Sequence, residues 1–179
     1  YVRAAAERAR AENLPCTFIA GDAFTHVCAQ KCEAAVNWFT SFSYSPDDET
    51  NRRQLQNVYD SLRPGGCFVM DFMNVPRVMA DFQAGLVMRS ANPNQQGLIV
   101  VQENRPDFLR GVMDSTWTFM YPDGRRVVRH IEPRLYMPHE IVRMLKQCGF
   151  GDIQLFGSTD GEPFERLSRR LVLRARRPA

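Results

Sequence analysis

The sequence contains no apolar run long enough to span a membrane, and no signal peptide opens it. These two absences disfavour an integral membrane protein and a secreted protein, so we expect the chain to be cytoplasmic. An initiator methionine is also missing, because Tyr1 opens the sequence. The formal net charge of +3 is too small to indicate nucleic-acid binding by itself.

The sequence also lacks the cysteine pattern of a disulfide-stapled protein and the ligand set of a structural metal site. Its five cysteines are an odd number, and Cys16 and Cys67 lie within apolar, strand-like runs, which indicates reduced thiols. His26, Cys28 and Cys32 lie close together in the sequence, but no second pair of ligands follows them. We therefore predict that the protein binds no metal ion.

Helical patterns recur along the chain. Residues 1–13 are rich in alanine, glutamate and arginine, which favour helix. A second predicted helix begins at Ser45 and repeats apolar residues at helical spacing as far as Leu62. Another begins at Pro138 and stops at Gly149, and a short one is expected at residues 76–83.

Three short segments are predicted to be buried β-strands, because β-branched and aromatic residues dominate them. They are Cys16–Ala20, Ala34–Phe39 and Cys67–Phe72. The last of them shows little alternation, so we expect both of its faces to be covered, as in a parallel sheet. The turn Pro64–Gly66 stops the preceding helix just before this strand, as a crossing between parallel strands requires.

The character of the chain changes after Val75, where antiparallel strands are expected instead. The strong turn Tyr121–Gly124 joins two of these strands. The predicted strands are Gly97–Asn104, Gly111–Met120 and Arg125–Tyr136, followed near the end of the chain by residues 152–157 and 169–177. No repeat, low-complexity stretch or linker interrupts the sequence, so we expect one domain over residues 1–179, with a β-rich insertion at residues 86–136.

An ordered set of segments resembles a known family. The segments are RAENLPCTFIAGDAF (10–24), AAVNWFTSFSY (34–44), VYDSLRPGGCFVMDFMN (58–74) and LYMPHEIVRMLKQCGFGDIQLFG (135–157). Together they look like the class I S-adenosylmethionine-dependent methyltransferases of the small-molecule type. The resemblance implies an α/β fold with a Rossmann-like sheet, mostly parallel with an antiparallel last strand, plus an antiparallel β insertion.

The sequence departs from this family at its start. The family begins with a strand, a glycine-rich turn that binds the cofactor, a helix and a second strand, and none of these is present here. In the family's strand order, 3-2-1-4-5-7-6, the missing strands lie between the segments that match Cys16–Ala20 and Ala34–Phe39. Unpaired backbone groups there would cost about 1–3 kcal/mol each. A further segment, another chain or a rearranged sheet with these two strands adjacent would each resolve the gap.

The resemblance implies S-adenosylmethionine as cofactor. In the family, the acid at Asp22 accepts a hydrogen bond from the adenine amino group, and the residues at the end of Ala34–Phe39 flank the sulfonium. The implied cofactor-binding residues are Gly21, Asp22, Ala23, Phe24, Asn37, Trp38 and Phe39. Taken without the resemblance, Gly21 and Asp22 form an ordinary turn, and the aromatic residues Trp38 and Phe39 are equally expected in the core.

The methyl acceptor is expected beyond the same strand ends, because ligands of open α/β sheets bind there. The candidate catalytic residues are Tyr44, Asp71 and His130, and the candidate acceptor contacts are Ser41, Phe42, Asn74, Trp117 and Arg134. His130 is the natural general base by its ordinary pKa, but a single histidine on an alternating strand is more often exposed. Asp71 could equally cap the loop that follows it.

The reaction implied is direct methyl transfer to an oxygen or nitrogen of a small molecule, without a metal. A non-catalytic remnant or binding module with the same fold is the main alternative. The basic segment 168–177 could instead indicate an RNA-modifying enzyme, although its arginines alternate with apolar residues, as in a strand with one wet face. Neither the acceptor nor the oligomeric state follows from the sequence.

Overall fold

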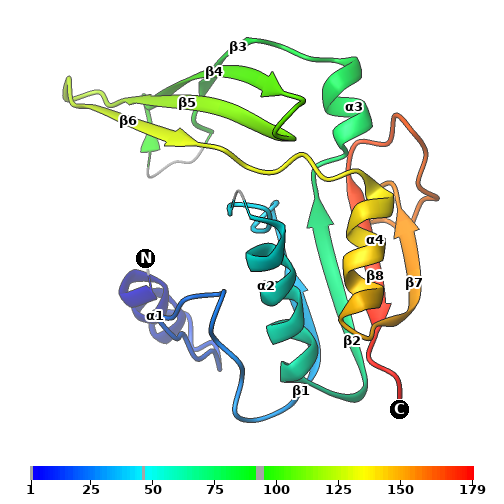
Figure 1. The fold of residues 1–179 in the computed structure, drawn as a ribbon. Helices are drawn as coiled ribbons and strands as arrows, with labels where there is room; N and C mark the ends of the chain where they lie inside the picture. The colour runs from blue at the N-terminus through cyan, green and yellow to red at the C-terminus, as the bar shows by residue number, and fades with distance from the viewer. Residues whose placement is uncertain (1, 46, 92–94) are drawn as a thin grey trace.

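The computed structural model describes residues 2–45, 47–91 and 95–179, which form two β-sheets and the helices around them (Figure 1). Sheet A has the order β1-β2-β8-β7. Its strands are β1 (Cys32–Asn37), β2 (Leu62–Phe72), β7 (Gly151–Phe156) and β8 (Leu171–Arg176). β1 pairs parallel with β2, while β8 runs antiparallel to both β2 and β7, so the last strand alone reverses direction, as predicted.

Sheet B has the order β3-β4-β5-β6 and is antiparallel throughout. Its strands are β3 (Gly85–Arg89), β4 (Ile99–Asp107), β5 (Val112–Met120) and β6 (Arg126–Ile131). The predicted β-rich insertion is therefore a sheet of its own. The edge strand β3 was not predicted, because its five residues are mostly exposed and show no alternation.

Two of the helices cover one face of sheet A. The helices are α1 (Val2–Ala11), α2 (Asp48–Ser61), α3 (Val75–Ala80) and α4 (Pro138–Gln147). α2 and α4 lie side by side on the same face of sheet A, and their apolar sides bury the main core (Figure 1). Within the described residues, no helix is long and apolar enough to cross a membrane.

The prediction that both faces of the central strand are covered is wrong in part. Phe68, Met70 and Phe72 are completely or almost completely buried under the helices. Cys67 and Val69, which alternate with them on the other face, are only half-buried. Helices therefore cover one face of this strand and not the other.

The backbone where α2 passes into β2 shows why the Pro-Gly-Gly sequence needs its glycines. β2 already begins at Leu62, so Pro64–Gly66 forms the start of the strand rather than a loop before it. Gly65 adopts a left-handed conformation with φ of 76°. A Cβ atom on Gly66 would come within 2.8 Å of the Arg63 carbonyl oxygen, so no larger residue fits there without a shift.

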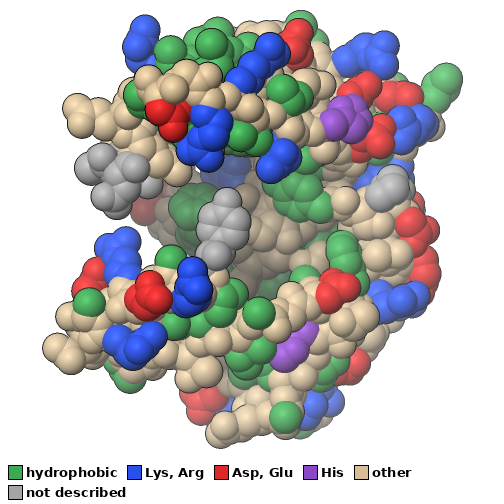
Figure 2. Space-filling view, turned by 90° about the vertical axis from the view of Figure 1, so that its left-hand side faces the viewer, with side chains coloured by type: hydrophobic (Ala, Val, Ile, Leu, Met, Phe, Trp, Pro, Cys, Tyr) green, Lys and Arg blue, Asp and Glu red, His purple; other side chains and the backbone are tan. Residues whose placement is uncertain are grey.

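The N-terminal part of the chain differs from the prediction. Cys16–Ala20 forms no strand: these residues are exposed and belong to neither sheet. The rearranged sheet is thus not adopted, and β1 is an edge strand on which Val36 is 64% exposed. Figure 2 shows a hollow on this side of the molecule, between sheet B and the N-terminal segment.

Hydrogen bonds from Arg134 and Tyr136 to Asp48, together called the latch, join the segment after β6 to the start of α2. The predicted helix start at Ser45 is displaced to Asp48, and Pro46 lies outside the described residues. Arg134 Nε donates to Asp48 Oδ1 at 2.9 Å, and the Tyr136 hydroxyl donates to the same oxygen at 2.7 Å. Burial, and then the hydrogen bond to Asp48, raise the pKa of Tyr136 to about 12.

This latch predicts a loss of stability at high pH. In the unfolded chain the pKa of Tyr136 is about 10, whereas in the folded protein it is about 12. The free energy of unfolding should therefore decrease as the pH rises from about 10 to about 12, because the unfolded state loses the proton first. The Tyr136→Phe variant should be less stable at neutral pH, and its deficit should narrow as the pH rises through this interval. Urea titrations of both proteins test this, and a constant deficit would contradict it.

Candidate functional site

The parallel pairing of β1 and β2 brings the carboxyl ends of two strands together. Asn37, the last residue of β1, is in register with Met70, one residue before Asp71. The chain then leaves β1 through a short loop, in which Thr40 N–H donates to the Asp71 carbonyl oxygen at 3.0 Å. The loop after β1 is thereby fixed against the end of β2.

A cavity of about 510 Å³ lies against this loop. Three parts of the chain surround it: the loop after β1, helix α3 with the residues that follow, and one face of sheet B. Its lining residues are Phe39, Thr40, Tyr44, Met73, Arg77, Val78, Asp81, Phe82, Gln83, Leu86, Gln102, Asn104, Met113, Ser115, Trp117, Ile131 and Pro133. Phe39, Tyr44 and Trp117 were predicted as site residues.

Sheet B supplies polar groups to the cavity by simple alternation. Gln102 and Asn104 are two residues apart on β4, and Met113, Ser115 and Trp117 follow the same spacing on β5, so all point to one face. The Ser115 hydroxyl donates to Asn104 Oδ1 at 2.8 Å. The polar residues of this wall follow one another with other polar residues between them, so no alternation in the sequence marks the wall.

Helix α3 closes another side of the cavity with a balanced pair of charges. Arg77 Nε lies 2.9 Å from Asp81 Oδ2, one turn further along the chain. The same guanidinium donates to the Leu167 carbonyl oxygen at 2.8 Å. This pair adds no net charge to the cavity, which suits an uncharged or weakly charged ligand.

The loop after β1 presents two aromatic side chains to solvent. Trp38 is 36% exposed and Phe39 81% exposed, and their ring centroids lie 6.2 Å apart in an edge-on arrangement. Asn37 Oδ1, just before them, is buried and has no hydrogen-bond partner among the described residues. Exposed aromatic faces beside an unpaired carbonyl oxygen suit a cationic ligand.

Asp71 is buried, and both of its carboxylate oxygens have partners. Arg170 donates from Nε to Oδ1 at 2.6 Å and from Nη2 to Oδ2 at 2.9 Å. Phe39 N–H also donates to Oδ2, at 3.1 Å. Because Arg170 and Phe39 N–H bind its carboxylate, Asp71 is not available to a methyl acceptor. Arg170 was not among the predicted site residues.

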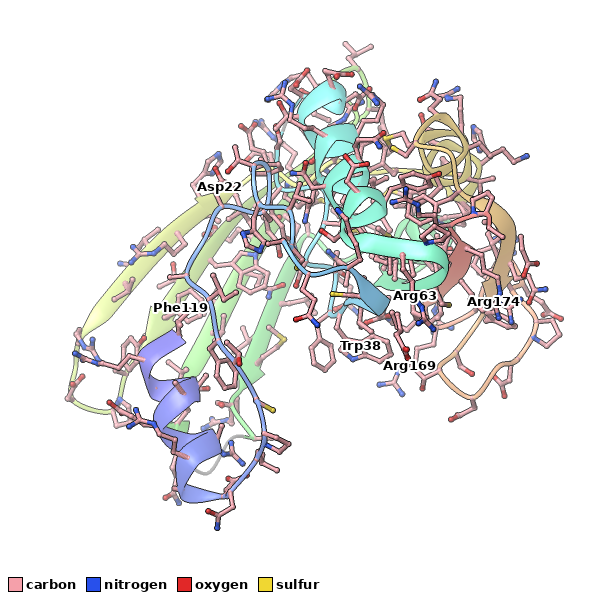
Figure 3. All side chains as sticks on the ribbon, turned by 90° about the horizontal axis from the view of Figure 1, so that it is seen from below. Asp22, Trp38, Arg63, Phe119, Arg169 and Arg174 are labelled. Carbon is pink, nitrogen blue, oxygen red and sulfur yellow. The ribbon has the colours of Figure 1, made fainter. Side chains whose placement is uncertain are left out.

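The predicted adenine loop lies apart from the cavity. Asp22 Oδ1 accepts a hydrogen bond from Phe24 N–H at 2.9 Å, so it stabilises its own turn. The Ala23 carbonyl oxygen accepts a hydrogen bond from Asn57 Nδ2 at 3.2 Å, which ties the turn to α2. In Figure 3, Asp22 lies on the N-terminal loop and Trp38 at the end of β1, in separate parts of the structure. Gly21–Phe24 line no part of the cavity.

Two predicted acceptor contacts have other partners. Phe42 is completely buried in the core, where its ring packs beside those of Phe72 and Tyr136, so no ligand can reach it. Arg134 belongs to the latch with Asp48. A loop aromatic and a strand arginine give no sequence signal that separates such structural positions from ligand contacts.

The remaining predicted residues also lie outside the cavity lining. Asn74 is buried, and its Nδ2 donates to the Ser168 carbonyl oxygen at 2.8 Å, which anchors the loop before β8. His130 is exposed on β6, with Nδ1 3.6 Å from Asp114 Oδ1. Ser41 donates its hydroxyl back to the backbone of its own loop.

A larger hollow of about 790 Å³ lies over α4 and β7. It is lined by one helix face and by Leu155, and no strand end or loop brings polar groups together there. The smaller cavity is the better candidate site, because it combines apolar walls with converging polar side chains. Among residues 2–45, 47–91 and 95–179, no group of three or more His, Cys, Asp or Glu side chains could hold a metal ion.

Comparison with known proteins shows which solved structures this chain resembles. No protein-family model matches the sequence, and no curated protein matches it. An S-adenosylmethionine-dependent methyltransferase from Clostridium acetobutylicum superimposes with a TM-score of 0.79 at 16% identity, over 98% of this chain and 70% of that one. The sugar N-methyltransferase KedS8 from Streptoalloteichus gives 0.69 at 19%, over 99% and 67%.

A cofactor-bound structure is among the similar proteins. CalS10 from Micromonospora echinaspora, an amino pentose methyltransferase solved with S-adenosylmethionine, gives a TM-score of 0.61 at 19% identity, over 97% of this chain and 70% of that one. Likeness at these identities establishes the fold: an α/β methyltransferase-like fold with a mixed sheet and a second, antiparallel sheet.

The Ser115–Asn104 hydrogen bond predicts a measurable coupling within the cavity wall. In a double-mutant cycle, Ser115→Ala and Asn104→Ala should show a coupling of about 1 kcal/mol in the free energy of unfolding. The matched control is the cycle of Ser115→Ala with Gln102→Ala, which no hydrogen bond joins. Urea unfolding of the six proteins measures both cycles, and equal coupling in the two would refute the assignment.

Proposed function

We propose that this chain transfers a methyl group from S-adenosylmethionine to an oxygen or nitrogen of a small molecule bound in the 510 Å³ cavity. The observation that supports this most is the match of almost the whole chain to the fold of methyltransferases, at a TM-score of 0.79. The cavity lies at the carboxyl ends of β1 and β2, where ligands of open α/β sheets bind.

The chain's own residues suit part of this cofactor. When bound, S-adenosylmethionine supplies a methyl group on a positively charged sulfur, which is already a good leaving group. Trp38 and Phe39 offer aromatic faces to a cation, and Asn37 Oδ1 is a free buried acceptor beside them. Gly21–Phe24 remain the proposed adenine contacts by resemblance, although the Asp22 carboxylate already serves its own turn.

For the transfer itself, the protein needs to align the acceptor and exclude water. Trp117 gives the acceptor a flat apolar surface, and Gln102 and Asn104 offer hydrogen bonds that fix its orientation. Tyr44 lines the same cavity, so its hydroxyl is the proposed group to accept or donate a proton at the acceptor. Asp71 and His130 suit this role less, because each faces a partner elsewhere.

An acceptor with several hydroxyl groups on a ring fits this lining. Amide and hydroxyl side chains on one sheet face can pair with such hydroxyls, while Trp117 packs against the ring. Two of the similar structures are described as acting on sugars, a sugar N-methyltransferase and an amino pentose methyltransferase. We therefore place a sugar-like small molecule first among the acceptors.

We also propose that the free edge of β1 pairs with a further β-strand, from another segment or another chain. An unpaired strand edge exposes backbone donors and acceptors, and Val36 on it is 64% exposed. Residues Cys16–Ala20, which lack strand partners, belong to the N-terminal segment that borders the hollow on the same side (Figure 2). A strand in this hollow would complete the cofactor side of the site.

Cofactor binding tests the proposed function. Calorimetric titration with S-adenosylmethionine should give measurable micromolar binding, and Phe39→Ala should weaken it about fivefold by removing an aromatic face. Phe108→Ala is the matched control, because Phe108 is 72% exposed, like Phe39 at 81%, but lies on the turn between β4 and β5. The control should bind like the original protein.

The outcome that contradicts methyl transfer is equally clear. A folded protein that takes up no S-adenosylmethionine would favour the alternative of a binding module with a methyltransferase-like fold. Equal weakening by Phe39→Ala and Phe108→Ala would remove the loop after β1 from the cofactor site. Circular dichroism of each variant shows that the comparison is made between folded proteins.

A further inference from the structure

We propose that Arg170 is a positioning residue for the loop Trp38–Ser41. Through its ion pair with Asp71, it holds this loop in the backbone conformation that forms one wall of the cavity. The bearing of this clamp on methyl transfer rests on the proposed function, whereas the clamp itself follows from the geometry of the chain.

The clamp consists of bonds that converge on Asp71 and the loop. Arg170 binds both carboxylate oxygens in a side-by-side arrangement, at 2.6 and 2.9 Å. Its Nη2 also donates to the Thr40 hydroxyl oxygen at 2.9 Å. Asp71 in turn accepts from Phe39 N–H with its side chain and from Thr40 N–H with its backbone. Arg170 thus holds the loop both directly and through Asp71.

The loop needs such restraint, because its backbone is strained. Phe39 has φ of 53° and Thr40 has φ of 58°, so two consecutive residues with side chains adopt the left-handed conformation. Thr40 is β-branched, which makes that conformation especially unfavourable. Residues in such conformations persist where surrounding contacts over-determine them, and they concentrate at functional sites.

The restraint on the loop determines which side chains line the cavity on this side. Phe39 and Thr40 both line it, and Phe39 is 81% exposed. An apolar ring held out in solvent has an energetic cost that the fold does not otherwise need. The clamp therefore keeps an aromatic side chain available to a ligand.

Arg170 also assigns a role to Asp71. A carboxylate with both oxygens bound to a guanidinium, and one also to a backbone N–H, is fixed in place by its partners and serves as an anchor. We place Asp71 in the positioning machinery together with Arg170, rather than as the group that accepts a proton from the acceptor.

A purely structural ion pair is the competing explanation, and β8 offers a matched control for it. Arg174 pairs with Asp152 at 2.9 Å, and its side chain is 33% exposed, against 32% for Arg170. The two arginine side chains are thus almost equally exposed and each binds an aspartate, although Asp152 is 47% exposed and Asp71 only 5%. Only Arg170 touches the loop. Figure 3 shows Arg174 on sheet A, apart from Trp38.

The experiment compares Arg170→Met with Arg174→Met in the full chain by amide hydrogen exchange. In Arg170→Met, exchange at Phe39 and Thr40 should accelerate at least about tenfold relative to the core amides of Phe68. In Arg174→Met the same ratio should change less than about twofold. Arg170→Lys, which keeps the charge but loses the side-by-side geometry, should give an intermediate acceleration.

Each outcome decides the proposal without any cofactor. If the loop and core amides accelerate equally in Arg170→Met, the ion pair only stabilises the fold and the clamp is refuted. If Arg174→Met frees the loop as much, the effect does not belong to Arg170. Should Arg170→Met fail to fold, the exchange ratio in Arg170→Lys decides. Absence of S-adenosylmethionine binding by the original protein would reject the proposed function while the exchange result still stands.

Discussion

The parallel pairing of β1 with β2 is the constraint on which the rest of the site depends. Among the described strands it is the only parallel pair, and its register sets Asn37 opposite Met70. Because both strands finish at the same edge, the loop after β1 falls on the last residues of β2. The Asp71 carboxylate can then reach Phe39 N–H, and the cavity has a fixed side against which α3 and sheet B close.

Much of the fold could be predicted, because local signals agree with the tertiary structure. The Pro-Gly-Gly sequence after α2, the tight turn at Tyr121–Gly124 and the apolar spacing of the α4 region each determine their own segment. Cys16–Ala20 shows the limit of such signals. Its residues favour a strand, but a strand exists only with a partner, and partner strands are a property of the whole sheet.

The site could be predicted in part for the same reason. Phe39, Tyr44 and Trp117 were expected from strand ends and from an aromatic residue on the inserted sheet, and all three line the cavity. Arg170 could not be predicted as a site residue, because 99 residues separate it from Asp71. Its neighbours alternate between polar and apolar residues, as in a strand with one solvent-exposed face. Phe42, two residues before Tyr44, shows that adjacent loop aromatics can face opposite environments.

The ion pair between positions 71 and 170 also bears on the order in which the molecule is assembled. Arg170 is synthesised 99 residues after Asp71, and the cavity walls themselves come from stretches as distant as Thr40 and Pro133. Contacts of such long sequence separation form late in folding. A nascent chain can therefore build helix α2 and the hairpin of sheet B while it still has no finished pocket, so binding competence arrives only after Arg170 has been synthesised and has paired with Asp71.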